Sequence, residues 1–358
     1  MEEHLPVWSL AGACRKRLAS LALVAPVVAL VALAGCAHTS HAPQQSPPGW
    51  RTVRPPHDVE ALALQENILW AGGKDGVYAI AVDTCEVTPL VADIPLAYVS
   101  ALAVDADGTL WIGHQGGLTH CRNGGCHTYT EQDGLPDRRV NALLVDSSGV
   151  LWVGTWGGVA IREGSGWRYL RSRDGLADDM VNVILEDREG GIWFGSYVAP
   201  RGGLTRLQGG HAQRWTVADG LPHSNITSLL RTHSGDIWVG TGLLDRGGAV
   251  RLSRRGESWA ITRVLTRRDG LAGAKVRSIY QDSSGVLWFG SEYDGVARWD
   301  GSSWRVFRQE DGLAHNEVKA MLEDGSGALW LATRDGLTRI SREALSALGA
   351  GAGDASSS

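Results

Sequence analysis

The sequence predicts an all-β fold built from repeated units, and three observations lead to that prediction. The 358 residues include 47 Gly and 15 Trp but only 3 Phe and 3 Met, which indicates many tight turns and one favoured large core residue. A tryptophan within an apolar run recurs seven times along the chain, at intervals of 40 to 50 residues. A chain of this length can hold one large all-β domain of the barrel or propeller kind.

The N-terminal region predicts an exported protein. A basic cluster, "RKR" at residues 15–17, precedes an apolar run at residues 18–34, as in a secretory signal. The stretch "LAGC", residues 33–36, resembles a bacterial lipobox, which implies cleavage before Cys36 and lipidation of its sulfur. A retained membrane anchor and an ordinary signal with an incidental cysteine are the alternatives.

The lipobox resemblance also implies a location. Ala37 after the lipidated cysteine implies the outer membrane, if the organism is Gram-negative. Residues 1–35 are then a lipoprotein signal peptide, and the Pro- and Gln-rich residues 36–49 are a flexible tether. We therefore expect an exported protein that is lipid-anchored to the bacterial cell envelope and touches the membrane through this lipid.

Seven units of similar sequence follow the tether. The units begin at Val59, Val99, Val140, Val181, Ile226, Val276 and Val318. Their tryptophans are Trp70, Trp111, Trp152, Trp193, Trp238, Trp288 and Trp330. The period and the strand content are typical of a β-propeller blade, and seven is a common blade number.

The third unit shows how one blade is built. Residues 140–146, "VNALLVD", alternate as a strand does, and "SSG" follows as a turn. The segments "VLWVGT", "GVAIRE" and "WRYLRS" supply three more strands, so each unit is a four-stranded antiparallel meander. We interpret Trp152 and its six equivalents as inter-blade core, each contributing up to about 4–6 kcal/mol.

The two ends of the repeat region predict how the ring closes. The last unit stops after its third strand, "GLTRIS". The missing fourth strand matches "GWRTV" at residues 49–53, which resembles the fourth strands "GWRYL" and "SWRVF". We therefore expect an N-terminal strand to complete the last blade of a propeller over residues 50–342, followed by a disordered tail at residues 343–358.

The phrase "VRSIYQDSSGVLWFGSEYDGVARWDGSSWRVFRQEDGL", residues 276–313, resembles the two-component regulator propeller repeat. The resemblance covers roughly residues 50–342, because turn, Trp, Gly and "DGL" keep their order in most units. It implies a seven-bladed propeller. It also implies a sensor-like role, since such propellers often form the periplasmic part of membrane histidine kinases and recognise carbohydrates or other ligands.

Several kinds of chemistry are disfavoured by the sequence. The formal net charge of −5 makes nucleic acid an unsuitable partner. The motif "DGL" recurs at Asp133, Asp174, Asp219, Asp269 and Asp311, and this regularity favours a turn over metal ligands. The stretch "DADG", residues 105–108, is a turn for the same reason. We expect no metal site and no cofactor.

The stretch "HCRNGGCHTY", residues 120–129, mixes cysteines and histidines and could suggest zinc. Strand alternation places Cys121 and Cys126 opposite each other on one face, with His120 and His127 on the other face. A hairpin disulfide between Cys121 and Cys126 is therefore the prediction for an oxidising compartment, and Cys85 is left unpaired.

An enzyme is the alternative to a binding protein. The sequence contains no nucleophile elbow, phosphate loop or zinc-protease motif. Streptogramin lyases are the nearest enzymatic comparison, having seven Trp-containing blades and a catalytic His, so a propeller lyase or hydrolase is the second hypothesis. The isolated candidates are His114, His223 and His315, which are no complete acid–base set.

The loops between second and third strands differ most between units and supply the candidate binding site. They should share one face with the connections between blades. The candidate ligand-binding residues are Trp156, Tyr197, Arg201, Asp245, Arg246, Glu292, Tyr293, Asp294, His114 and Gln115. This mixture suits a carbohydrate, a peptide or a protein loop, and merely solvated loop tips are the alternative. The hypothesis is a non-enzymatic, monomeric propeller that binds a ligand or a protein partner on this face.

Overall fold

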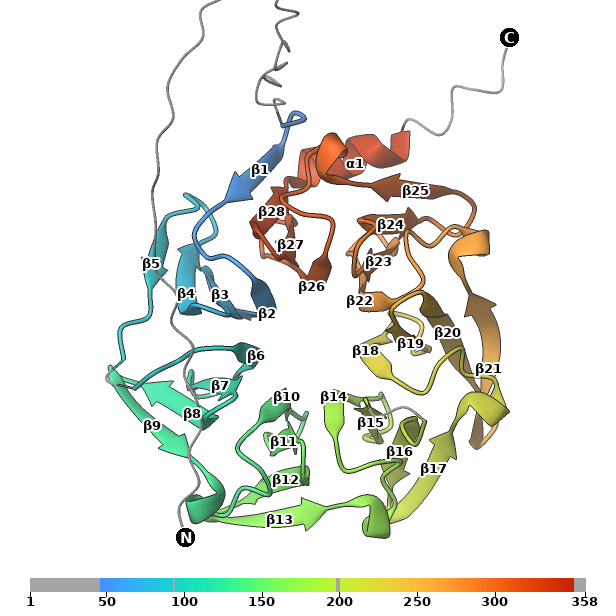
Figure 1. Ribbon diagram of the computed structural model, residues 1–358. Coiled ribbons are helices and arrows are strands. Elements are labelled where there is room, and N and C mark those ends of the chain that lie inside the picture. The colour runs from blue at the N-terminus through green and yellow to red at the C-terminus, as the bar shows by residue number, and fades with distance from the viewer. Residues whose placement is uncertain (1–45, 93, 198–199, 351–358) are drawn as a thin grey trace, which may run out of the picture. The chain divides into compact units, whose positions relative to one another are not determined.

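The computed structural model describes residues 46–92, 94–197 and 200–350. The signal peptide, Cys36 and nearly all of the expected tether lie outside the described residues. The described chain forms seven four-stranded antiparallel sheets arranged as blades around a ring, as predicted (Figure 1). The first strand of each blade lies innermost and the fourth lies at the outer edge.

The strands of each blade follow one another along the chain, except in the seventh. Blade one has β2 (Val59–Gln65), β3 (Ile68–Gly73), β4 (Gly76–Ala81) and β5 (Val87–Pro89). Blade two has β6 (Val99–Val104), β7 (Leu110–His114), β8 (Gly117–Arg122) and β9 (Gly125–Tyr129). Blade three has β10 (Val140–Val145), β11 (Leu151–Thr155), β12 (Gly158–Glu163) and β13 (Gly166–Leu170). Blade four has β14 (Val181–Glu186), β15 (Ile192–Ser196), β16 (Leu204–Gln208) and β17 (His211–Trp215).

The remaining blades follow the same plan. Blade five has β18 (Ile226–Arg231), β19 (Ile237–Leu243), β20 (Arg246–Arg255) and β21 (Ser258–Leu265). Blade six has β22 (Val276–Gln281), β23 (Leu287–Ser291), β24 (Val296–Trp299) and β25 (Trp304–Phe307). Blade seven has β26 (Val318–Glu323), β27 (Leu329–Thr333), β28 (Gly336–Ile340) and, from the N-terminal side, β1 (Trp50–Val53).

The repeated tryptophan is a core residue that also fastens a turn. The indole N–H of Trp152 donates to Asp146 Oδ2 at 2.8 Å, while Oδ1 of the same carboxylate accepts the amides of Ser148 and Val150. The same arrangement recurs at Trp111, Trp193, Trp288 and Trp330. The core prediction is confirmed for five tryptophans, which are at most 8% exposed; Trp70 and Trp111 are only partly buried.

The "DGL" motif is a turn, as predicted. In each copy the aspartate ends a short 3-10 helix; these helices are η1 (Glu131–Asp133), η2 (Ser172–Asp174), η3 (Val217–Asp219), η4 (Arg267–Asp269) and η5 (Gln309–Asp311). Asp133 Oδ2 accepts the amide of Thr130 at 2.9 Å, and Gly134 has φ 96°, which glycine adopts without strain. Leu135 is then buried between blades.

The predicted closure of the ring is confirmed. Strand β1 pairs antiparallel with β28 through four residue pairs, from Trp50 with Ile340 to Val53 with Leu337. The structure corrects one part of the expected disordered tail, because helix α1 (Arg342–Ala350) follows β28. Its side chains Ala344, Leu345 and Leu348 lie on one face of the helix and pack against the core that contains Trp50, so apolar burial orders this segment.

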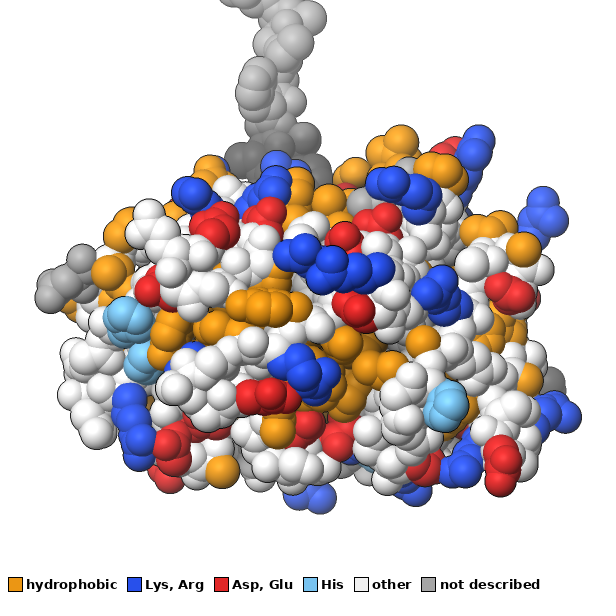
Figure 2. Space-filling model, turned by 90° about the horizontal axis from the view of Figure 1, so that it is seen from below, with side chains coloured by type: hydrophobic (Ala, Val, Ile, Leu, Met, Phe, Trp, Pro, Cys, Tyr) orange, Lys and Arg blue, Asp and Glu red, His pale blue; other side chains and the backbone are white. Residues whose placement is uncertain are grey.

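Hydrophobic side chains also reach the outer wall of the ring. On the side that carries β13 and β17 they form a band between basic and acidic side chains (Figure 2). The exposed hydrophobic residues of the described chain are nevertheless scattered over several blades, and their presence alone does not mark a site.

Candidate functional site

The loops between second and third strands share one face with the connections between blades, as the sequence predicts. Two cavities open there. The first, here called the cleft, lies between blades five and six and has a volume of about 680 Å³. The second, here called the small pocket, has a volume of about 370 Å³ and is lined by residues of blades one to three. Both volumes fall in the range typical of small-molecule sites.

One wall of the cleft is a hairpin of blade five that stays paired further than those of blades three and six. Strands β19 and β20 remain paired as far as Leu243 and Arg246, whereas the matching hairpin of blade three ends at Thr155 and Gly158. The extra residues raise a tip that carries Leu244, which is 66% exposed. This tip forms one wall of the cleft.

The other walls come from the connection between blades five and six and from the loop of blade six. Asp245, Glu292, Tyr293 and Asp294, four of the predicted site residues, line the cleft together. They are joined by Thr266, Arg267, Arg268 and Lys275 of the connection. The cleft therefore combines three acidic and three basic side chains with exposed apolar surface on Tyr293 and Leu244.

A buried ion pair forms the polar floor of the cleft. Lys275 Nζ lies 2.7 Å from Glu292 Oε2, and the two side chains are only 5% and 17% exposed. Burial alone would raise the pKa of Glu292, but the hydrogen bond from Lys275 and the charge of Arg277 hold this pKa below its ordinary value. The Glu292 carboxylate in turn raises the pKa of the Tyr293 phenol, whose O–H it accepts.

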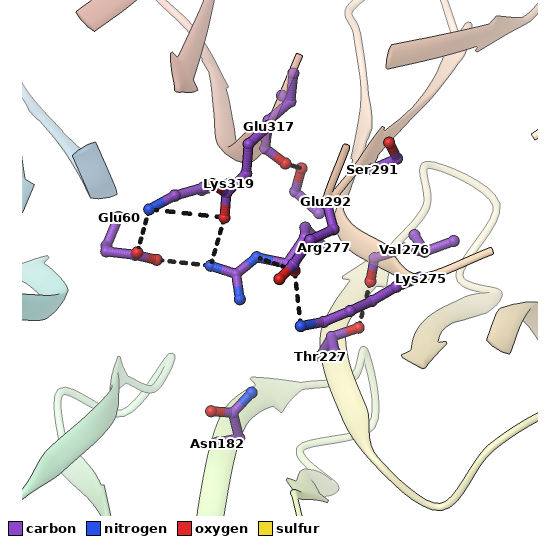
Figure 3. A network of polar contacts seen from close by, with 12 residues as sticks. Glu60, Asn182, Thr227, Lys275, Val276, Arg277, Ser291, Glu292, Glu317 and Lys319 are labelled. Carbon is purple, nitrogen blue, oxygen red and sulfur yellow. Dashed lines mark hydrogen bonds and ion pairs between the residues drawn. The ribbon is translucent and has the colours of Figure 1, made fainter. Parts of the chain in front are cut away.

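A central channel is lined by the innermost strands of all seven blades. The ion pair continues into a network of charged side chains at this channel (Figure 3). Arg277 lies 2.9 Å from Glu60, 3.5 Å from Glu292 and 3.8 Å from Glu317. Lys319 lies 2.5 Å from Glu60. Burial alone would lower the pKa of Lys319, but the carboxylates of Glu60 and Glu317 raise it. The pKa of Arg277 is raised in the same way, so Lys319 and Arg277 both stay protonated.

The sequence reasoning missed this network, although the alignment of the units contains a signal for it. One residue per blade, directly after the first residue of the unit, lies at the register shift of the innermost strand. These residues are Glu60, Ser100, Asn141, Asn182, Thr227, Arg277 and Lys319. In the alignment of the seven units, these residues form one column that is polar in every unit, although the strand around it is apolar. This column would have identified residues that line the channel.

Two uncharged members of this column have a structural role. Ser100 donates to the carbonyl of Val140 at 2.6 Å, and Asn182 donates to the carbonyl of Ile226 at 3.2 Å. Each of these bonds connects the innermost strands of two neighbouring blades. They therefore stabilise the ring whether or not a ligand is present.

The remaining predicted site residues are distributed over the face. Trp156 and Gln115 line the small pocket. Trp156 is 41% exposed, donates to Asn141 Oδ1 at 3.2 Å, and lies under the Arg139 guanidinium at 4.1 Å.

Four predicted site residues, His114 among them, line neither of these two cavities. Arg201 lies 3.6 Å from Asp178, and Arg246 follows Asp245 without lining the cleft. Tyr197 lies near Arg277, whose pKa its phenol helps to raise.

His114 is a correction to the predicted rim. It ends β7 and is only 4% exposed, with Nε2 at 2.9 Å from Thr119 Oγ1. It occupies the position of Thr155, whose hydroxyl is likewise buried and bonded within its own blade. The burial lowers the pKa of His114 and favours the neutral ring.

The other two histidine candidates hold the connections between blades. His223 Nδ1 accepts the amide of Asn225 at 3.0 Å, and His315 Nδ1 accepts the amide of Glu317 at 2.9 Å. Asp137 accepts the amide of Arg139 in the same way in blade three. The histidines therefore take the place of a turn-forming aspartate.

The predicted disulfide between Cys121 and Cys126 is present, and the two residues are paired across β8 and β9. His120 and His127 form the neighbouring pair on the other face, with their rings 5.7 Å apart. Cys85 is free and buried. Over residues 46–350, apart from 93, 198 and 199, no group of three or more His, Cys, Asp and Glu side chains is placed to hold a metal ion. None of the helices described in the structure is long and apolar enough to cross a membrane.

Comparison with known proteins agrees with the repeat structure. The family described as "Two component regulator propeller" matches residues 93–116, 134–157, 175–198, 220–242, 270–293 and 312–335. No curated protein matches the sequence.

Among solved structures, the fold is similar to the extracellular domain of a hybrid two component system from B. thetaiotaomicron, with a TM-score of 0.71 and 18% identity over 83% of this chain. This chain spans 42% of that domain. Virginiamycin B lyase from Staphylococcus aureus gives a TM-score of 0.65 and 14% identity, covering 82% of this chain and 98% of the lyase.

PorZ, a surface component of the type-IX secretion system of Porphyromonas gingivalis, gives a TM-score of 0.62 and 17% identity, covering 80% of this chain and 46% of PorZ. At these identities the likeness is one of fold.

Proposed function

Because the chain belongs to the two component regulator propeller family, we propose that it is an exported, lipid-anchored propeller that binds a ligand or a protein partner in a sensor-like role. The single observation that carries the proposal is the cleft. It gathers four residues of the variable loops around one cavity of ligand size. Extracellular two component domains with a similar fold support a receptor role outside the cytoplasm.

The proposed site binds without chemistry. Its ionisable floor is a closed ion pair, in which Glu292 is held deprotonated and Lys275 is its partner, so neither group is poised to move a proton. The histidines that a lyase hypothesis would use are bonded within their own loops or blade. We propose a lipid on Cys36 as the link to the outer membrane, because Cys36 directly follows the small residues that end the apolar run in "LAGC".

The proposal is tested by binding measurements on two tyrosine variants. Tyr293 is 58% exposed in the cleft, whereas Tyr169 is 41% exposed on the outer strand β13. A panel of oligosaccharides and short peptides is titrated against the wild type, and Tyr293→Ala should weaken the best probe about tenfold or more. Tyr169→Ala is the matched control and should bind normally. Equal affinities of both variants and the wild type for every probe would contradict a site in the cleft.

A further inference from the structure

The charges that line the cleft do not all have partners within the protein. Lys275 is paired with Glu292, and Arg267 lies 3.3 Å from Asp294. Two opposite charges remain, Asp245 on the tip of the blade-five hairpin and Arg268 on the connection to blade six. Within the described chain, neither of these side chains makes an ion pair or a side-chain hydrogen bond.

A ligand that satisfies both groups needs a cationic and an anionic end. A purely anionic ligand would pair with Arg268 but would be repelled by Asp245. A purely cationic ligand would pair with Asp245 but would be repelled by Arg268. The ligand must also cover apolar surface, because Leu244 and Tyr293 are 66% and 58% exposed at the same cleft. Ordered loops on three sides and a paired floor keep the cleft largely preformed, which lowers the entropic cost of binding.

We infer that the cleft binds short peptides with free ends. Asp245 receives the N-terminal ammonium, Arg268 receives the C-terminal carboxylate, and Tyr293 and Leu244 contact an apolar side chain between them. A guanidinium can donate two parallel hydrogen bonds to a carboxylate, which favours Arg268 over a lysine at this position. This inference rests on the proposed function, since it names the ligand class of the same cleft.

Tripeptides with blocked ends test the inference. The probes are tripeptides with Leu, Phe, Glu or Lys in the middle, each prepared with free ends, with an N-acetyl group, with a C-terminal amide, and with both. Titration calorimetry on the full chain in detergent should show that acetylation or amidation each weakens binding about five- to tenfold, as expected for one partly exposed charge-assisted contact. The peptide with a Leu or Phe centre should bind best.

Two variants assign each end of the peptide to its residue. Asp245→Asn should weaken the free peptide as much as acetylation does, and should have no effect on the acetylated peptide. Arg268→Gln should weaken the free peptide as much as amidation does, and should have no effect on the amidated peptide. Arg246→Gln is the matched control, because Arg246 is adjacent in the chain but does not line the cleft.

The outcomes separate the ligand class from the site. If free and blocked tripeptides bind equally and Tyr293→Ala weakens both, recognition of the free ends is wrong and the cleft remains the site. If only neutral oligosaccharides bind and Tyr293→Ala weakens them, the peptide class is wrong and the cleft remains the site. If no tripeptide binds the wild type, the inference is also overturned. If Tyr293→Ala changes the affinity of no probe at all, the proposed function fails together with the inference.

Discussion

Replacing Trp152 by alanine should destabilise the propeller by about 3–5 kcal/mol, as large-to-small substitutions of buried aromatic residues do. The side chain is 8% exposed, and its ring centroid lies 5.9 Å from that of Phe194 in the next blade. Burial of about 150–250 Å² at roughly 25 cal/mol/Å² gives an upper limit of about 4–6 kcal/mol, which is consistent with this range. Asp146 still accepts the amides of Ser148 and Val150 after the substitution, so the lost indole hydrogen bond adds little.

Trp156→Ala, only four residues further along the chain, should cost no more than about 1 kcal/mol. Trp156 is 41% exposed and loses one hydrogen bond to Asn141 and one contact with the Arg139 guanidinium. An exposed cation–π contact contributes about 0.5–1 kcal/mol. Trp156→Ala should instead weaken the binding of a ligand that extends into the small pocket, because Trp156 lines this pocket.

Equilibrium unfolding by denaturant, followed by circular dichroism, measures the two variants side by side. Trp152→Ala should move the midpoint strongly downwards and Trp156→Ala only slightly. If Trp152→Ala unfolds like the wild type, the assignment of this tryptophan to the inter-blade core is refuted. If Trp156→Ala is the more destabilised variant, the separation of scaffold from surface residues is refuted as well.

Two further predictions concern the N-terminal region. Cys36→Ala should abolish lipidation, so intact mass and detergent partitioning should show a lipid on the wild type and none on the variant; an unmodified Cys36 in the mature wild type would contradict the lipid anchor. Deletion of residues 49–53 should lower the unfolding midpoint far more than deletion of residues 351–358, because only the first removes a paired strand; similar small effects would contradict closure by β1.

Much of the fold was predictable because the chain repeats it seven times. The same strand pattern recurs in every unit, so the units can be compared with one another. This comparison predicted the core position of Trp152, the turn at Asp133 and the missing fourth strand of the last blade. The partner strand of β28 was identified for the same reason, since "GWRTV" has the form of a fourth strand.

The site was predictable only in part, because its geometry depends on what does not repeat. The loop comparison identified Asp245 and Tyr293, which meet in the cleft. It could not identify Arg268 or Lys275, because they lie before and after the regular "DGL" at residues 269–271, outside the loops that were compared. It also misplaced His114, although the column that holds Thr155 indicates a buried polar group.

Helix α1 was missed for a similar reason. The segment "REALSALGA" consists largely of good helix formers, but a helix of nine residues is too short to be stable alone, so its order depends on contacts with the core around Trp50. Such tertiary stabilisation is invisible to a comparison of repeats, because the segment lies beyond the last unit.

The pairing of β1 with β28 has a consequence for how the chain reaches its native state. The first and last strands of the propeller are neighbours in space, although nearly the whole ring separates them in sequence. Contacts between such distant segments form slowly, because a long loop must close first. Until they form, β28 exposes an unpaired edge that other chains can join. The interval between emergence of the last blade and capture of β1 is therefore the period in which this protein most needs protection from aggregation.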